Sequence, residues 1–269
     1  MSLKQSIPLT SVANARELGG YRTSDGRTVR SGVLLRTGNL NDITADDIQT
    51  LKNKYRLSNI IDFRMDMEIG GYEDPVIGGV CNTHLDVINI QDMLSPEMRD
   101  VEINKLDVIQ LVEMSEQMGM LNEDMYIGFL TNDMGKKAYS QFFRILLAAD
   151  PDRAVLWHCT SGKDRTGLAA MLTLSALGAE ESDIIDDYML TNEYNAGRIE
   201  GTKKYLRARG CDETLIGKAA LVFDAVDRRF IENAIAFLKE KYGSVVGYIR
   251  SELNISDIEI EILKEKYTK

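Results

Sequence analysis

The segment 154–178 constrains the fold of this chain more than any other. Residues 154–158 form a short apolar run ending in Trp157 and His158, which predicts a buried β-strand. A loop follows, and residues 168–177 have the pattern of a helix closed by Gly178. A loop that leads from a strand into a helix directs free backbone N–H groups and the positive end of the helix dipole toward one point. The sequence therefore predicts an anion-binding site at this loop.

Other segments alternate between strand and helix character. Residues 32–36 and 59–63 are apolar and β-branched, and residues 83–87 are a weaker strand candidate. A helical pattern covers 44–55, with Thr44 as its N-cap. From residue 168 to the C-terminus the pattern is helical. We therefore predict an α/β fold with a central, largely parallel sheet of about four or five strands flanked by helices.

The domain organisation is simple. The chain has no internal repeat, no low-complexity tract and only four prolines, so we predict a single domain over residues 1–269. Segment 91–134 has a helical pattern and holds seven of the twelve methionines. Methionine adapts to varied surfaces, so this helical insertion is interpreted either as a mobile lid or as ordinary helix packing.

Charge and hydropathy argue against several classes of protein. The net charge of −10 disfavours a nucleic-acid partner, whose phosphates need a broad basic face, and disfavours attraction to anionic membranes. No run of about 18 apolar residues is present, so we expect no stable membrane insertion. The N-terminus lacks the apolar core of a signal peptide, which predicts a cytoplasmic protein, although a signal peptide already removed would leave secretion open. The oligomeric state is not predicted.

Cysteines and histidines form no metal-ligand pattern. The three cysteines Cys81, Cys159 and Cys211 are an odd number for a disulfide framework, and the chain has only two histidines. We therefore expect no metal ion and no other cofactor. Cys81 and Cys211 are interpreted as small apolar residues.

Cys159 lies in the loop that follows the predicted strand 154–158, and this position bears on its chemistry. Cysteine is nucleophilic as the thiolate, which backbone N–H groups, a helix dipole and a nearby guanidinium favour. Arg165, six residues on, can fold back and offer two parallel donors to phosphate oxygens. Gly162 permits a tight loop, and Thr166 can hydrogen-bond the sulfur. Lys163 can bind a second negative group.

The loop pattern is specific. Cysteine and arginine at this spacing are a weak signal alone, but the preceding histidine, the fixed glycine and the Arg-Thr-Gly ending make it rare, on the order of one in a million per cysteine. Neither Cys81 nor Cys211 has an arginine six residues later. The sequence favours a metal-independent phosphatase over a non-catalytic phospho-ligand binding module. It also favours that function over sulfur or arsenate transfer, which usually needs a second thiol.

The loop from His158 to Gly167 resembles that of the bacterial tyrosine-phosphatase-like family of the mycobacterial PtpB and listerial LipA type. The resemblance covers nearly the whole chain. Further segments similar to motifs of that family are 14–21 (Asn-Ala-Arg-Glu-Leu-Gly-Gly-Tyr), 36–40 with the following Ile43-Thr44, 61–64 (Ile-Asp-Phe-Arg), and 242–250, which begins Tyr-Gly-Ser and ends Tyr-Ile-Arg.

This resemblance implies a cysteine-phosphatase-like fold and hydrolysis of phosphotyrosine through a cysteinyl-phosphate on Cys159, with Arg165 binding the phosphate. It also implies dual specificity and phosphoinositide activity, because Lys163 is shared with lipid-acting relatives. The expected substrate is thus a phosphotyrosine-containing protein or a phosphoinositide. Glu17 stands where the family usually has aspartate, and Thr37-Gly38 stands where it usually has serine pairs. These departures leave the substrate preference open.

Two aspartates are candidates for the proton donor to the leaving group. Asp164 lies within the loop and is the position proposed as acid in the family that the chain resembles; its alternative role is to orient Arg165. Asp62 ends a predicted strand and is held in reserve, with a helix cap or salt bridge as its alternative role. We predict Cys159, Arg165 and Asp164 as catalytic residues. The predicted substrate-binding residues are Thr160, Ser161, Gly162, Lys163, Thr166 and Asp62.

Overall fold

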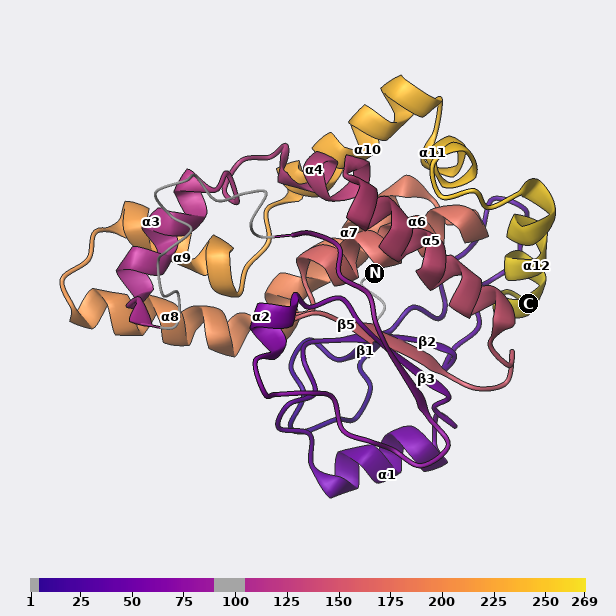
Figure 1. Cartoon of the computed structure of the whole chain (residues 1–269), viewed down its shortest axis with the longest axis horizontal. Coiled ribbons are helices and arrows are strands. Elements are labelled where there is room, and N and C mark those ends of the chain that lie inside the picture. Colours follow the sequence, from indigo (N-terminus) through magenta and orange to yellow (C-terminus); the bar gives the residue numbers. More distant parts are fainter. Residues whose placement is uncertain (1–4, 90–104) are drawn as a thin grey trace.

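The computed structural model describes residues 5–89 and 105–269, and a five-stranded sheet lies at the centre of this part of the chain (Figure 1). The order of the strands is β1-β2-β5-β3-β4. Neighbours are parallel except for β1, which pairs antiparallel with β2. The strands are β1 (Arg16–Glu17), β2 (Leu34–Thr37), β3 (Asn59–Asp62), β4 (Cys81–His84) and β5 (Val155–His158).

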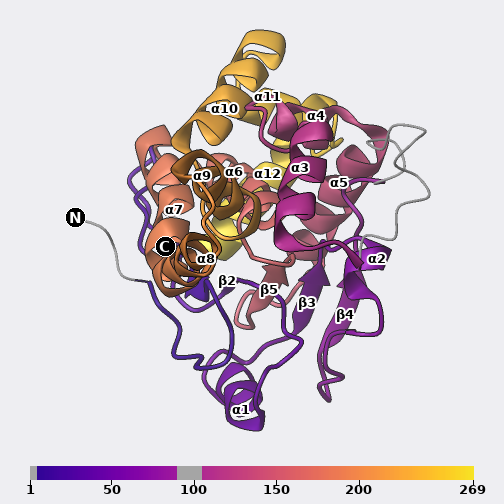
Figure 2. The same cartoon turned by 90° about the vertical axis from the view of Figure 1, so that its left-hand side faces the viewer.

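Helices cover both faces of the sheet (Figures 1 and 2). They are α1 (Ala45–Asn53), α2 (Asp66–Ile69), α3 (Val108–Gln117), α4 (Met125–Thr131), α5 (Asp133–Ala148), α6 (Asp164–Leu177), α7 (Glu181–Tyr194), α8 (Ala196–Ala208), α9 (Glu213–Phe223), α10 (Arg228–Tyr242), α11 (Val245–Ser251) and α12 (Asp257–Tyr267).

The period-2 alternation of the central strands builds two cores, one on each side of the sheet. On one side, Leu156 of β5 packs with Leu51 of α1. On the other side, Val155 and Trp157 join a larger core that contains α6 residues such as Leu168. Figure 1 shows α1 below the sheet and α5, α6 and α7 above it. Because α6 is enclosed by this larger core, it is buried on nearly all sides.

The predicted α/β fold with a largely parallel sheet is confirmed. The predicted strands 32–36, 59–63 and 154–158 correspond to β2, β3 and β5 within two residues. The weaker predicted strand, 83–87, is wrong in its bounds, because β4 spans Cys81–His84. The reason is that β4 is an exposed edge strand, so the apolar residues that suggested a strand there lie mostly beyond its end.

Helices α3, α8 and α9 form a smaller packed group beside the main body (Figure 1). Val112, Leu206, Ile216 and Ala219 make up its buried centre. Helices α3 and α4 fall within the predicted insertion 91–134, of which residues 91–104 lie outside the described residues. The single domain and the lid both stay predictions. Among the described residues, no helix combines the length and apolar character needed to cross a membrane.

Candidate active site

Cys159 lies at the carboxyl end of β5, immediately before the loop that leads into α6. Its side chain is buried, with 1% of the residue exposed. Gly162 takes a positive φ of 66°, and a Cβ there would collide with the carbonyl group of Thr37 in β2. Only glycine fits this close approach of two backbones. The predicted tight loop is therefore formed by contact with the neighbouring strand.

The outer side of the loop is held by side chains from the N-terminal part of the chain. Asn14 Nδ2 donates to the carbonyl oxygens of Ser161 and Gly162, at 3.2 and 2.8 Å. Arg36 Nη2 also donates to the Gly162 carbonyl, at 2.9 Å, and Asn39 Nδ2 donates to the Thr160 carbonyl at 3.0 Å. In a trans peptide the N–H points opposite to the C=O. The N–H groups of the following residues are thereby turned inward, where an anion can bind.

A buried ion triad supports this arrangement. Arg16 and Arg36 both pair with Asp187 of α7, at 3.2 and 2.6 Å, and all three are almost completely buried. Burial opposes ionisation of Asp187, but the two guanidiniums outweigh it and hold its pKa below the usual range. Burial and the neighbouring Arg16 lower the pKa of Arg36 to about 10, although Asp187 acts in the opposite direction.

Arg165 is fixed by Glu68, a residue of the short helix α2. Both terminal nitrogens of Arg165 donate to the Glu68 carboxylate, Nη2 to Oε1 at 2.8 Å, and Nη1 also reaches the carbonyl of Phe63 at 3.1 Å. Thr160 Oγ1 donates to the same Oε1 at 2.6 Å. Burial opposes ionisation of Glu68, yet Arg165 and these donors lower its pKa to about 2. The pair holds a permanent cation beside the loop.

Lys163 and Ser161 point their side chains at the end of α9. Lys163 Nζ donates to the carbonyl oxygens of Leu221, Val222 and Ala225, the last two at 3.0 and 3.3 Å. Ser161 Oγ donates to the carbonyl of Phe223 at 2.9 Å. These side chains satisfy carbonyls that the helix end leaves free. Their predicted contacts with substrate, including that of Lys163 with a second negative group, stay predictions.

Asp164 and Thr166 lie in the first turn of α6. The hydroxyl of Tyr126, in α4, donates to Asp164 Oδ1 at 2.6 Å. Asp164 Oδ2 lies 3.7 Å from Lys163 Nζ. Thr166 Oγ1 is buried and has no hydrogen-bond partner among the described residues, so the predicted bond to the Cys159 sulfur is not formed here.

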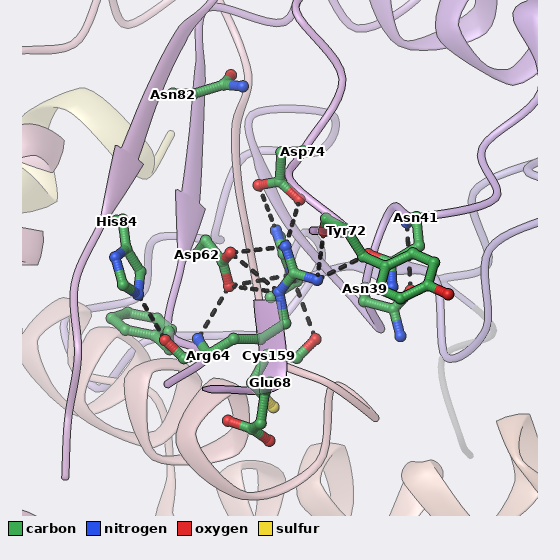
Figure 3. Close-up of polar contacts among 12 residues, drawn as sticks. Asn39, Asn41, Asp62, Arg64, Glu68, Tyr72, Asp74, Asn82, His84 and Cys159 are labelled. Carbon is green, nitrogen blue, oxygen red and sulfur yellow. Dashed lines mark hydrogen bonds and ion pairs between the residues drawn. The ribbon is translucent and has the colours of Figure 1, made fainter. Parts of the chain in front are cut away.

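Asp62 is engaged by Arg64 rather than directed freely into the site. Arg64 Nε lies 3.0 and 2.9 Å from its two oxygens. Figure 3 shows the Arg64 guanidinium between Asp62 and Asp74, and His158 Nε2 lies 2.8 Å from Asp74 Oδ2. The Arg64 guanidinium already supplies the positive charge that a metal ion would bring to these carboxylates. The contacts favour the salt-bridge interpretation of Asp62.

The structure brings to the site several residues that were not predicted as site residues. Asp86, just beyond β4, is a further carboxyl at this end of the sheet: its pKa is raised by burial, while His84 and Arg165 lower it. Its Oδ1 lies 3.3 Å from His84 Nε2. The missed residues belong to segments remote from the loop in sequence, and only Asn14 stands in a segment, 14–21, that resembles a family motif. They are Asn14, Glu68, Asp74, Asp86, Tyr126 and Asp187.

Comparison with known proteins finds similarity to phosphatases in each case. The sequence profile of the tyrosine phosphatase family matches residues 7–269. A protein of Cupriavidus necator whose name assigns it to the tyrosine-protein phosphatases is 27% identical over 94% of this chain and 85% of its own length. A tyrosine-protein phosphatase of Nostoc commune is 33% identical over 44% of this chain and 40% of its own. The triple specificity protein phosphatase PtpB of Mycobacterium tuberculosis is 30% identical over 47% of this chain and 48% of its own.

Proposed function

Because the chain belongs to the tyrosine phosphatase family and is a protein-tyrosine phosphatase, we propose that it hydrolyses phosphomonoesters through a cysteinyl-phosphate on Cys159, without a metal ion. The observation that carries the proposal is the loop between β5 and α6. It joins a buried cysteine, inward-facing N–H groups and the Arg165 guanidinium, which Glu68 holds in place.

In the first step, the electron pair of the Cys159 thiolate forms the S–P bond while the bond from phosphorus to the leaving oxygen breaks. Arg165 and the loop N–H groups bind the three other oxygens, on which charge accumulates in the transition state. Asp164 donates its proton to the leaving oxygen, so tyrosine departs as a neutral phenol.

In the second step, water attacks the phosphorus of the cysteinyl-phosphate. Asp164, now ionised, takes a proton from this water as the new P–O bond forms. The S–P bond breaks, and inorganic phosphate and the thiolate result.

We propose phosphotyrosine-containing proteins as the main substrates, with dual specificity and phosphoinositide hydrolysis as extensions. The resemblance of the loop, including Lys163, supports this breadth. A second phosphate on the substrate would have to replace the carbonyls of Val222 and Ala225, at and just beyond the end of α9, around the Lys163 ammonium. Rates on phosphotyrosine, phosphoserine and phosphothreonine peptides and on phosphoinositides, measured side by side, decide between these classes.

The direct test is hydrolysis of p-nitrophenyl phosphate in the presence of EDTA. We expect turnover by the wild type, loss of activity to background in Cys159→Ser, and a fall of roughly 10²–10³-fold in kcat for Arg165→Lys, which loses the two-pronged donor. Cys81→Ser, at an exposed cysteine, is the matched control and keeps the wild-type rate. An inert wild type that still binds a phosphotyrosine peptide would indicate a binding module. Activity in Cys159→Ser would contradict the proposed nucleophile.

A further inference from the structure

We propose that Tyr126 and Tyr188 are positioning residues for Asp164: together they fix its carboxyl group so that Oδ2 faces the leaving oxygen. The inference rests on the proposed function, in which Asp164 is the acid. It adds two residues from outside the loop, one of them from the predicted insertion, to the machinery for proton transfer.

The three side chains form a continuous chain of hydrogen bonds. The Tyr126 hydroxyl donates to Asp164 Oδ1 at 2.6 Å, and the oxygen of Tyr188, in α7, lies 2.8 Å from the Tyr126 oxygen. The two rings meet edge to face at 90°, with centroids 6.0 Å apart. Tyr126 is fully buried and Tyr188 is 2% exposed. Packing therefore fixes both hydroxyls, and they in turn fix Asp164.

The direction of the chain follows from the chemistry of the groups. Burial and the neighbouring Asp164 raise the pKa of both tyrosines well above the ordinary value, so both hydroxyls keep their protons. The Tyr126 hydroxyl has one proton, and it uses this proton to donate a hydrogen bond to Asp164 Oδ1. Its oxygen is then free to accept the proton of Tyr188. Each hydroxyl in such a chain strengthens the donor ability of the next.

This arrangement leaves Oδ2 of Asp164 for catalysis. A carboxylate at the start of a helix commonly accepts from the first backbone N–H groups, but the N-cap of α6 is Lys163, whose side chain makes no capping hydrogen bond. Asp164 is instead drawn toward Tyr126 through Oδ1. Among the residues that the structure describes, the one ion pair of Oδ2 is with Lys163 Nζ, at 3.7 Å, and the side chain keeps 18% exposure. The unbound oxygen is thus the one that can carry the transferred proton.

The surroundings of the chain are mostly apolar. Tyr126, Tyr188, Lys163 and Asp164 line a cavity of about 20 Å³, and most of its other walls are apolar, among them Phe230 of α10. This volume holds about one water molecule. Tyr126 is itself fully buried, so the hydrogen bond from its hydroxyl to Oδ1 is shielded on the tyrosine side and can orient Asp164.

The test compares two aryl phosphates whose leaving groups differ in their need for a proton. Phenolate needs protonation more than p-nitrophenolate does, so loss of acid catalysis shows mainly on phenyl phosphate. For Tyr126→Phe we expect kcat on phenyl phosphate to fall roughly tenfold, part of the 10²–10⁴-fold typical of general acid catalysis. We expect kcat on p-nitrophenyl phosphate within about threefold of wild type and KM unchanged for both. Tyr188→Phe follows with a smaller loss, and Asp164→Asn with a larger one.

The matched control is Tyr248→Phe, which removes a buried hydroxyl that donates to the carbonyl of Leu130 in α4 at 2.6 Å, without touching Asp164. It keeps the wild-type ratio of the two kcat values, whatever its thermal stability. A wild-type ratio in Tyr126→Phe, or an equal loss on both substrates with raised KM, overturns the inference. A wild-type ratio in Asp164→Asn overturns it as well. Failure of the proposed function is separate, since it shows as turnover that does not depend on Cys159.

Discussion

At the scale of single residues, Glu68 shows how a side chain outside the loop orients the phosphate-binding residue Arg165. Its carboxylate accepts hydrogen bonds from both terminal nitrogens of Arg165 and from the hydroxyl of Thr160. It also accepts one from the backbone N–H of Met65, at 2.7 Å. A guanidinium held by two parallel bonds cannot rotate freely. Arg165 is therefore oriented before substrate binds, which reduces the ordering that the transition state requires.

We expect Glu68→Gln to lower kcat/KM for p-nitrophenyl phosphate by roughly ten- to a hundredfold. Glutamine keeps the size of the side chain but loses the charge and one of the two acceptor oxygens that hold Arg165. Glu73→Gln, at an exposed position in the next loop, is the control and leaves kcat/KM unchanged. Equal kcat/KM for Glu68→Gln and wild type would show that Arg165 needs no such partner.

The sequence could reveal Cys159 and Arg165 but not Glu68, and the reason is physical. The nucleophile Cys159, the phosphate-binding Arg165 and the start of the helix must lie close together in one loop, so their spacing is a local pattern. Glu68 reaches the loop only because the parallel pairing of β3 with β5 brings α2 beside it. Asp187 likewise meets Arg16 through tertiary packing, 171 residues apart in sequence. Contacts of this kind leave no signal in the spacing of residues.

At the scale of elements, the shape of the loop depends on strand β2. The carbonyl of Thr37 fills the space where any side chain at position 162 would begin, and the φ of 66° is strained for other residues. The loop can thus take its anion-binding form only with a glycine at this contact.

We expect Gly162→Ala to destabilise the protein by about 2–4 kcal/mol and to abolish measurable phosphatase activity, because the backbone of the loop or of β2 must shift. Gly201→Ala is the matched control. Gly201 lies in α8 with open space around its Cα, so alanine there stabilises by about 0.5–1 kcal/mol and leaves activity unchanged. Thermal unfolding and the p-nitrophenyl phosphate assay check both variants. A stable, active Gly162→Ala would refute the contact.

Elements that are buried on both sides were easier to predict than those at the edges. Strands β2, β3 and β5 lie inside the sheet, and each contains two or three consecutive apolar residues. Strand β1 has two residues and β4 is exposed, so neither carries a clear pattern. Helix α6 begins at Asp164, four residues before the predicted start. Polar residues that serve chemistry fill its first turn, so the apolar pattern starts late.

At the scale of the whole molecule, buried charges make stability depend on pH. The pKa of Glu68 is lowered to about 2 from its ordinary 4.5. A lowered folded-state pKa gives stability that is present above pH 4.5 and is lost as the pH falls toward 2. The shift corresponds to about 3 kcal/mol.

We therefore expect the difference in unfolding free energy between wild type and Glu68→Gln to shrink by about 3 kcal/mol as the pH falls from 5 toward 2. Denaturant unfolding of both proteins at a series of pH values measures this difference. Other carboxyls titrate in both proteins and largely cancel in the comparison. A difference that stays constant with pH would show that Glu68 is not ionised against Arg165.

The contact between Asn14 and the catalytic loop also has a consequence for biosynthesis. Asn14 Nδ2 binds the carbonyl of Gly162, 148 residues further along the chain. At translation rates of 5–20 residues per second, roughly seven to thirty seconds pass between the synthesis of Asn14 and that of Gly162. The catalytic loop therefore cannot reach its active form by local folding as it leaves the ribosome. The enzyme gains its activity late, when the two distant parts of the chain have met.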